Sequence, residues 1–191
     1  MLVITLMIAA DPKGPMWKIR SPIASIAPWN YPFQLAIIPL ANAIAAGNRV
    51  MIKPSEFTPS VSALIEKLVG EVFSTDEVTV VQGDASVGAE FTKLPFDHLI
   101  FTGSTAVGRH VMAAAAANLT PVTLELGGKS PALIAPDYPV AQAADRIAFG
   151  KCFNAGQTCV APDYVLLPEA QLEAFITAFA DSIARRYPDM A

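Results

Sequence analysis

Short runs of apolar and β-branched residues alternate with longer alanine-rich stretches of helical spacing from about residue 21 onward. This alternation is typical of βαβ units, in which helices cover both faces of a parallel sheet. The run "HLIFT", residues 98–102, is apolar at almost every position, as expected for a strand buried on both faces. The sequence therefore predicts an α/β fold with a parallel sheet.

Turn signals divide this alternation into elements. Strands are predicted at 23–27, 49–53, 78–82, 98–102 and 122–125. Helices are predicted at 33–46, 59–73 and 104–118, with a short helix near 87–93. Gly47, which precedes Asn48, and Gly70 fall where helices usually end, so we expect both at helix C-caps.

A second group of elements follows the glycine pair at residues 127–128. It consists of a strand at 132–134, a helix at 140–152, a strand near 164–167 and a closing helix from residue 168. The change near residue 125 resembles a domain crossing. We therefore expect a first domain over residues 1–125 and the start of a second over residues 126–191.

The chain is unusually apolar, with 53% hydrophobic and 16% charged residues. A membrane segment, or apolar faces that something outside this chain covers, would explain this composition. Pro39 and Asn42 interrupt the longest apolar run, which is too short for the roughly 18–20 residues of a spanning helix. The second explanation is therefore favoured. Residues 1–15 lack the basic start of a signal peptide, so we expect a cytoplasmic protein.

Charge and metal-ligand patterns exclude two further classes of partner. The net charge is −4 and the basic residues are scattered, which does not fit a nucleic-acid-binding stripe. Two cysteines without a Cys-x-x-Cys pair predict neither a disulfide framework nor a zinc site. His98 and His110 each lack a second ligand at metal spacing, so we expect them to be surface or helix-capping residues.

The segment "FTGSTAVG", residues 101–108, leads from a strand into a helix. Gly103 would let the backbone approach a pyrophosphate, and the Ser104 hydroxyl would lie at a helix N-terminus suited to anions. The spacing of the two glycines is looser than the dinucleotide fingerprint Gly-x-Gly-x-x-Gly. An ordinary glycine turn is therefore the alternative.

"KPSE", residues 53–56, follows another strand end, at the edge where open α/β sheets bind ligands. Lys53 could donate to a ribose hydroxyl. Glu56 could accept from the 2′-hydroxyl and would repel a 2′-phosphate, which favours NAD over NADP. A solvated turn is the alternative interpretation.

Two polar residues in apolar surroundings are candidates for catalysis. The rigid turn "APWNYP", residues 27–32, could position the Asn30 amide to donate to an oxyanion, although an Asx turn explains it equally. Glu125 precedes two glycines at a strand end, where a carboxylate is costly to bury unless it serves proton transfer. A hinge between domains is the alternative for Glu125.

Cys159 ends the segment "FNAGQTC", whose small residues leave access to a thiol. A nucleophilic cysteine needs such access together with nearby donors. Cys152 lies seven residues earlier in a helical, apolar context, and we expect it to be a packed thiol.

Taken together, these segments resemble the aldehyde dehydrogenase superfamily. The resemblance covers roughly residues 21–187, and five motifs occur in order: "PWNYP", "KPSE", "FTGSTAVG", "LELGGKSP" and "FNAGQTC". The stretches "LTPVTLELGGKSP" and "NAGQTCVAPDYVL" look most like the branch of fatty-aldehyde and coniferyl-aldehyde dehydrogenases. The resemblance implies a Rossmann-like dinucleotide-binding domain and the start of a catalytic domain, an incomplete form of the family's fold.

The resemblance also implies roles for the motif residues. Cys159 would attack the aldehyde carbonyl, and Asn30 with the Cys159 backbone N–H would bind the oxyanion. Glu125 would act as general base for hydrolysis of the resulting thioester. Cofactor contacts would come from residues of three motifs, with NAD as the cofactor and NADP as an alternative: Trp29, Lys53, Glu56, Gly103 and Ser104.

The length departs from the family, whose members are more than twice as long, so we expect a partial member. The resemblance implies a small-molecule aldehyde as substrate, hydrophobic or aryl, and homo-oligomers among relatives. Apolar surface that another part would cover predicts self-association of this chain. The alternative function is a catalytically silent fragment that binds nucleotide or serves in assembly.

Overall fold

The computed structural model describes residues 21–190, so the interpretation of residues 1–15 lies outside the described part. The chain divides between Leu126 and Gly127 into two compact units. Each unit has its own sheet and its own core. This division lies beside the predicted boundary at residue 125, while the roles predicted for the two domains stay predictions.

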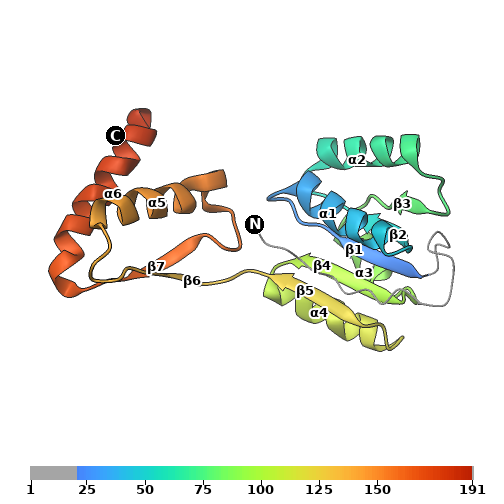
Figure 1. The fold of residues 1–191 in the computed structure, drawn as a ribbon. Helices are drawn as coiled ribbons and strands as arrows, with labels where there is room; N and C mark the ends of the chain where they lie inside the picture. The colour runs from blue at the N-terminus through green and yellow to red at the C-terminus, as the bar shows by residue number, and fades with distance from the viewer. Residues whose placement is uncertain (1–20, 191) are drawn as a thin grey trace. The chain divides into compact units, whose positions relative to one another are not determined.

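The first unit is built on a parallel sheet. Its strands are β1 (Pro22–Ile26), β2 (Arg49–Lys53), β3 (Val78–Val80), β4 (His98–Gly103) and β5 (Val122–Leu126). Its helices are α1 (Pro32–Ala45), α2 (Pro59–Val72), α3 (Ala85–Phe91) and α4 (Thr105–Ala116). The strand order is β3-β2-β1-β4-β5 (Figure 1), and all pairs are parallel. The predicted α/β fold with a parallel sheet is confirmed.

The order of the strands reverses direction beside β1. From β1 the chain adds β2 and then β3 on one side, and it returns to place β4 and β5 on the other side. A reversal of this kind leaves a crevice at the carboxyl ends of the central strands, which is where such sheets bind ligands.

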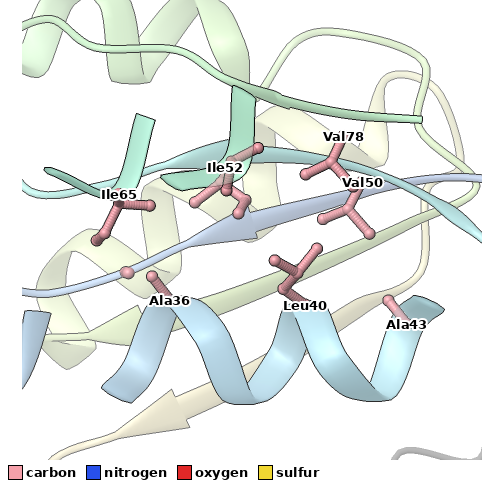
Figure 2. Close-up of a cluster of buried hydrophobic side chains, with 9 residues drawn as sticks. Ala36, Leu40, Ala43, Val50, Ile52, Ile65 and Val78 are labelled. Atoms are coloured by element: carbon pink, nitrogen blue, oxygen red, sulfur yellow. The ribbon is translucent and has the colours of Figure 1, made fainter. Parts of the chain in front are cut away.

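Alternation along β2 shows how the sheet buries both faces. Val50 and Ile52 belong to the core cluster formed with α1 and α2, whereas Met51 packs against the cluster formed with α3 and α4. Figure 2 shows Val50 and Ile52 with the facing side chains of α1, which recur at helical spacing: Ala36, Leu40 and Ala43. Period two in the strand and period 3.6 in the helix therefore meet in one core.

One of the two predicted glycine caps is confirmed. Gly47 has a φ of 80° after α1, and its N–H donates to the Ile44 carbonyl at 2.8 Å. The Asn48 N–H donates to the Ala43 carbonyl at 3.0 Å, which completes a Schellman motif. The expectation for Gly70 is wrong, because Gly70 lies inside α2. The chain leaves that helix through the extended residue Phe73, so no left-handed glycine is needed.

Side-chain caps shift two helix boundaries from their predicted positions. The Asp84 carboxylate accepts from the N–H groups of Ser86 and Val87 at 2.9 and 3.3 Å, so α3 begins before the predicted residue 87. Ser104, predicted as helical, is instead the N-cap of α4.

His98 corrects the expectation of a surface or capping histidine. It lies within β4, half-buried, and its Nε2 is 2.8 Å from the Thr123 hydroxyl oxygen on β5. Burial lowers the pKa of this imidazole because the charged form is disfavoured. His110 is exposed on α4, as expected for a surface residue.

The second unit packs two strands against two helices. Its elements are β6 (Ser130–Leu133), α5 (Val140–Cys152), the 3₁₀ segment η1 (Phe153–Gly156), β7 (Pro162–Leu166), η2 (Glu169–Gln171), α6 (Leu172–Arg186) and η3 (Pro188–Met190). Strands β6 and β7 pair in parallel. The core contains residues from the strand end and both helices, namely Ile134, Ala143, Ala144 and Phe175.

A buried hydroxyl in β1 gives a stability prediction. Ser25 is buried, and its hydroxyl has no hydrogen-bond partner among the described residues. Ser25→Ala should raise the free energy of unfolding by about 1 kcal/mol, because it removes an unsatisfied polar group. Ser62, also buried, is the matched control, since its hydroxyl donates to the Ser55 carbonyl at 2.9 Å. Ser62→Ala should lower the free energy by about 1 kcal/mol.

Urea denaturation followed by circular dichroism measures both changes. A loss of stability in Ser25→Ala as large as that in Ser62→Ala would contradict the prediction.

Candidate functional site

A pocket of about 540 Å³ opens at the carboxyl ends of β1, β2 and β4, between α3 and α4. Its volume is within the roughly 300–1,000 Å³ of small-molecule sites. It lies where the strand order reverses, as expected for a nucleotide site in a sheet of this type. All five residues predicted for cofactor binding line it: Trp29, Lys53, Glu56, Gly103 and Ser104.

Lys53 is a buried charge at the pocket wall, with only 3% of its surface exposed. Its ammonium donates to the Pro54 carbonyl at 3.0 Å and to Glu56 Oε2 at 3.2 Å. An ammonium has three N–H groups, so these contacts leave one for a further acceptor. Helix α3 packs beside this side chain, since a Cβ at Gly88 would lie 3.9 Å from Lys53 Cε, at ordinary van der Waals distance. A buried, partly satisfied cation beside a carboxylate is suited to binding vicinal hydroxyls.

The strand-to-helix turn after β4 contributes the second polar edge of the pocket. Ser104 caps α4, and its hydroxyl accepts from the Val107 N–H at 3.3 Å. At Gly103 a Cβ would lie 2.5 Å from the Phe101 ring, which is packed in the core. Only glycine fits there, so the backbone meets the pocket without a side chain. The free N–H groups and positive end of α4 at this edge are suited to an anion such as a pyrophosphate.

The helical walls of the pocket were not predicted from the sequence. Small residues of α3 and apolar residues of α4 line it, together with His110 and Phe57: Ala85, Gly88, Ala89, Val107, Val111 and Ala114. The spacing of Ala85, Gly88 and Ala89, at i, i+3 and i+4, puts them on one helix face. This spacing could have been used to predict a helix face of small residues, against which a flat group can pack.

Asn30 and Glu125, two of the three predicted catalytic residues, are not among the pocket-lining residues. Asn30 follows Trp29 in the bend after β1. Glu125 is half-buried on β5, paired in register with Thr102. Its neighbours Leu124 and Leu126 pack on the cluster with α3 and α4, so Glu125 points to the opposite face of the sheet. The boundary between the two units, between Leu126 and Gly127, comes just after Glu125 in the chain. The alternative interpretation of Glu125 as part of a hinge between domains therefore also stays open.

Cys159, the third predicted catalytic residue, is an exposed free thiol in the second unit. It lies in a turn between η1 and β7. Cys152 is half-buried at the last position of α5. The two cysteines therefore differ in exposure in the direction that the sequence predicts.

The backbone ahead of Cys159 adopts a rare conformation. Asn154, Ala155 and Gly156 have φ values of 51°, 56° and 78°, so three successive residues are left-handed. For residues other than glycine this conformation costs about 1–3 kcal/mol and is concentrated at functional sites. The strain at Ala155 supports a functional interpretation of the cysteine segment.

A backbone contact fixes the other side of the cysteine segment. A Cβ on Gly128 would lie 3.0 Å from the carbonyl oxygen of Cys159, so the glycine backbone packs against the cysteine backbone. The motif "LELGGKSP" therefore contacts the cysteine segment through its second glycine.

No group of three or more His, Cys, Asp or Glu side chains in residues 21–190 could bind a metal ion. None of the helices formed by these residues has the length and apolar character required to span a bilayer.

Comparisons with known proteins agree with this geometry. A profile described as "Aldehyde dehydrogenase family" matches residues 16–187. The "Probable coniferyl aldehyde dehydrogenase" of Pseudomonas aeruginosa is 56% identical over 169 residues, or 88% of this chain and 36% of that protein.

Two solved structures are similar in fold as well as in sequence. Staphylococcus aureus AldH, in a substrate-bound state, has a TM-score of 0.84 at 46% identity and covers 89% of this chain. The match takes in 37% of that chain. The C291A mutant of AldC from Pseudomonas syringae, complexed with NAD+ and octanal, has a TM-score of 0.82 at 33% identity. That match covers 87% of this chain and 35% of AldC.

This chain thus spans about a third of the length of the curated relatives that it matches, for example 36% of the Pseudomonas aeruginosa protein. Within that span, the family match includes the whole pocket of the first unit and the cysteine segment of the second. The chain belongs to the aldehyde dehydrogenase family.

Proposed function

We propose that this protein oxidises a hydrophobic or aryl aldehyde to the carboxylic acid, with NAD(P) as cofactor and Cys159 as nucleophile. The observation that carries the proposal is the pocket at the strand reversal, which brings together the five residues predicted for cofactor binding. Membership of the aldehyde dehydrogenase family supports the reaction class.

The residues of the pocket fit a dinucleotide. The buried Lys53 ammonium and the Glu56 carboxylate, 3.2 Å apart, would bind the hydroxyls of a ribose. Ser104 and the first N–H groups of α4 would bind the pyrophosphate. The bound cofactor supplies the hydride acceptor. The Glu56 carboxylate would repel a 2′-phosphate, so we propose NAD as the preferred cofactor and NADP as an alternative.

Membership of the family supports the chemistry that we propose at Cys159. The Sγ atom would bond to the aldehyde carbon and form a thiohemiacetal. The Asn30 amide and the Cys159 backbone N–H would donate to the oxyanion. After oxidation, Glu125 would accept a proton from the water that hydrolyses the thioester, which releases the acid and restores the thiol.

Substrate, location and assembly belong to the same proposal. The coniferyl aldehyde dehydrogenase and the octanal complex among the similar proteins favour an aryl or long-chain aldehyde. Exposed apolar side chains in both units support self-association and homo-oligomers: Phe57, Leu119, Leu133 and Val160. A cytoplasmic location remains part of the proposal.

The proposal is tested by following NADH absorbance when the purified chain, under reducing conditions, meets NAD and an aryl or medium-chain aldehyde. NADH formation that requires both reagents supports the proposal. Folded, NAD-binding protein without turnover would contradict it, and the chain would then be a nucleotide-binding module.

Lys53→Met should weaken NAD binding by about 10- to 100-fold, because a hydrogen bond to a charged donor contributes about 1.5–3 kcal/mol. Isothermal titration calorimetry with NAD measures the change. Lys67→Met is the matched control, since Lys67 is exposed on α2 and pairs only weakly with Glu71 at 3.9 Å. Equal NAD affinity in both variants would exclude this pocket as the ribose site.

A further inference from the structure

Asp163 is an extra residue in β7. Ser130 of β6 pairs with Pro162, and the next residue, Pro131, pairs with Tyr164, so Asp163 is skipped in the register. A register shift of this kind resembles a β-bulge, which redirects a side chain and is common beside active sites. It lies four residues after Cys159.

The carboxylate of Asp163 bridges two lysines from different segments. Oδ1 is 3.2 Å from Lys129 Nζ and 3.9 Å from Lys151 Nζ. Lys129 lies just before β6, and Lys151 lies in the last turn of α5. The Asp163 carboxylate therefore joins the start of β7, on which it lies, to the start of β6 and to the end of α5.

Each lysine is next to a backbone contact of the cysteine segment. Gly128, which precedes Lys129, packs against the Cys159 carbonyl oxygen, with a Cβ position 3.0 Å away. On the other side, the carbonyl oxygen of Lys151 is 3.2 Å from the Cβ position of Gly156, the last left-handed residue before the cysteine. The two segments that Asp163 joins thus support the cysteine segment from both of its sides.

We propose that Asp163 is a positioning residue for Cys159, acting through Lys129 and Lys151. The role as positioner of a nucleophile rests on the proposed function, whereas the ordering of the cysteine segment does not. Asp163 itself is not expected to contact the substrate.

The two ion pairs are partly exposed, with 32% of the Asp163 side chain and 82% of the Lys129 side chain accessible. Exposed pairs of this kind contribute little to the stability of a whole domain. Their loss should therefore change local order in the turn more than it changes the unfolding of the whole unit.

The test compares Asp163→Asn with the parent chain by amide hydrogen exchange. The reporting amides are those of Gln157 and Ala161, which donate to the Asn154 and Thr158 carbonyls at 3.0 and 3.1 Å. Their exchange should become about tenfold faster, while exchange in α6 stays unchanged. Asp163→Glu, which keeps the charge, should restore part of the protection.

Asp145→Asn is the matched control. Asp145 is another partly exposed carboxylate of the second unit, and it accepts from the Ser182 hydroxyl at 2.6 Å and from Arg186 Nη2 at 2.9 Å. Its loss should affect the packing of α5 on α6 and leave exchange at Gln157 and Ala161 unchanged.

A second readout is the rate of alkylation by iodoacetamide, with Cys152 as internal reference. In Asp163→Asn the ratio of the Cys159 rate to the Cys152 rate should rise by about threefold or more, because the reagent can approach the exposed thiol from more directions when the turn is loosened. If the chain turns over, its kcat should fall in the same variant with KM unchanged, since access improves while geometry is lost. A mere change in charge would not raise alkylation and lower turnover together.

Unchanged exchange and an unchanged alkylation ratio in Asp163→Asn would overturn the proposal. A rise at both cysteines together with faster exchange in α6 would also overturn it, because it would show a general loss of stability. Neither readout uses NAD or aldehyde, so failure of the proposed function is scored separately.

Discussion

Replacing Cys159 with serine is expected to abolish NADH formation, lowering kcat by about 10³-fold or more. A serine hydroxyl at this exposed turn would lack the nucleophilicity of a thiolate. NAD affinity should not change, because the residues that line the pocket all belong to the first unit. NADH absorbance at saturating NAD measures kcat, and calorimetry measures the affinity for NAD independently.

Cys152→Ser is the matched control for this experiment. Cys152 is half-buried at the end of α5, and its substitution should leave kcat within about threefold of the parent value. Activity that survives in Cys159→Ser and disappears in Cys152→Ser would assign the chemistry to the other thiol.

Replacing Ile52 with alanine is expected to lower the free energy of unfolding by about 2–5 kcal/mol. Ile52 has no exposed surface, and it lies between Ser25 of β1 and Val80 of β3 in register, under α1 and α2 (Figure 2). The free energy of unfolding of a whole domain is only about 5–15 kcal/mol, so the variant should unfold at a markedly lower urea concentration.

Leu64→Ala provides the control, because Leu64 is 49% exposed on α2 of the same unit. Its effect should stay within about 1 kcal/mol. Equal effects of the two substitutions would contradict the assignment of Ile52 to the core. The residue after Ile52 is Lys53, so this core also fixes the position of the proposed ribose-binding cation.

The sheet could be predicted from the sequence because each strand carries its own signal. The run 49–53 alternates between two cores, and its end at Lys53 puts a charge where apolar residues stop. The turn at Gly103 and Ser104 could be predicted for a similar reason, since a glycine and a capping residue mark the passage from strand to helix. Local sequence signals therefore predicted the polar edges of the pocket, although not its helical walls.

Features that depend on distant segments could not be predicted. The register shift at Asp163 exists only relative to Ser130 and Pro131 on β6, and nothing local to β7 marks it. Gly70 is a position where a local signal misled: a glycine near the end of a helix suggested a cap. Val69 before it and Phe73 after it both pack on the core, and the helix continues past the glycine.

The cysteine segment lies between these two cases. Asn154 and Gly156 tolerate a left-handed backbone conformation, so a turn could be predicted there from the sequence. Ala155 does not favour that conformation, and its strain is visible only in the structure. This strain and the contact of Gly128 with Cys159 are what the structure adds to the motif.

Intact-mass spectrometry of Glu125→Gln, mixed with NAD and an aryl aldehyde, tests whether Cys159 forms the proposed covalent intermediate. Without the proposed base the thioester should accumulate, because its hydrolysis is slowed. We expect an NAD-dependent mass gain equal to the aldehyde less two hydrogens, located on Cys159 by peptide mapping. No NAD-dependent adduct, or an adduct on Cys152 instead, would contradict it.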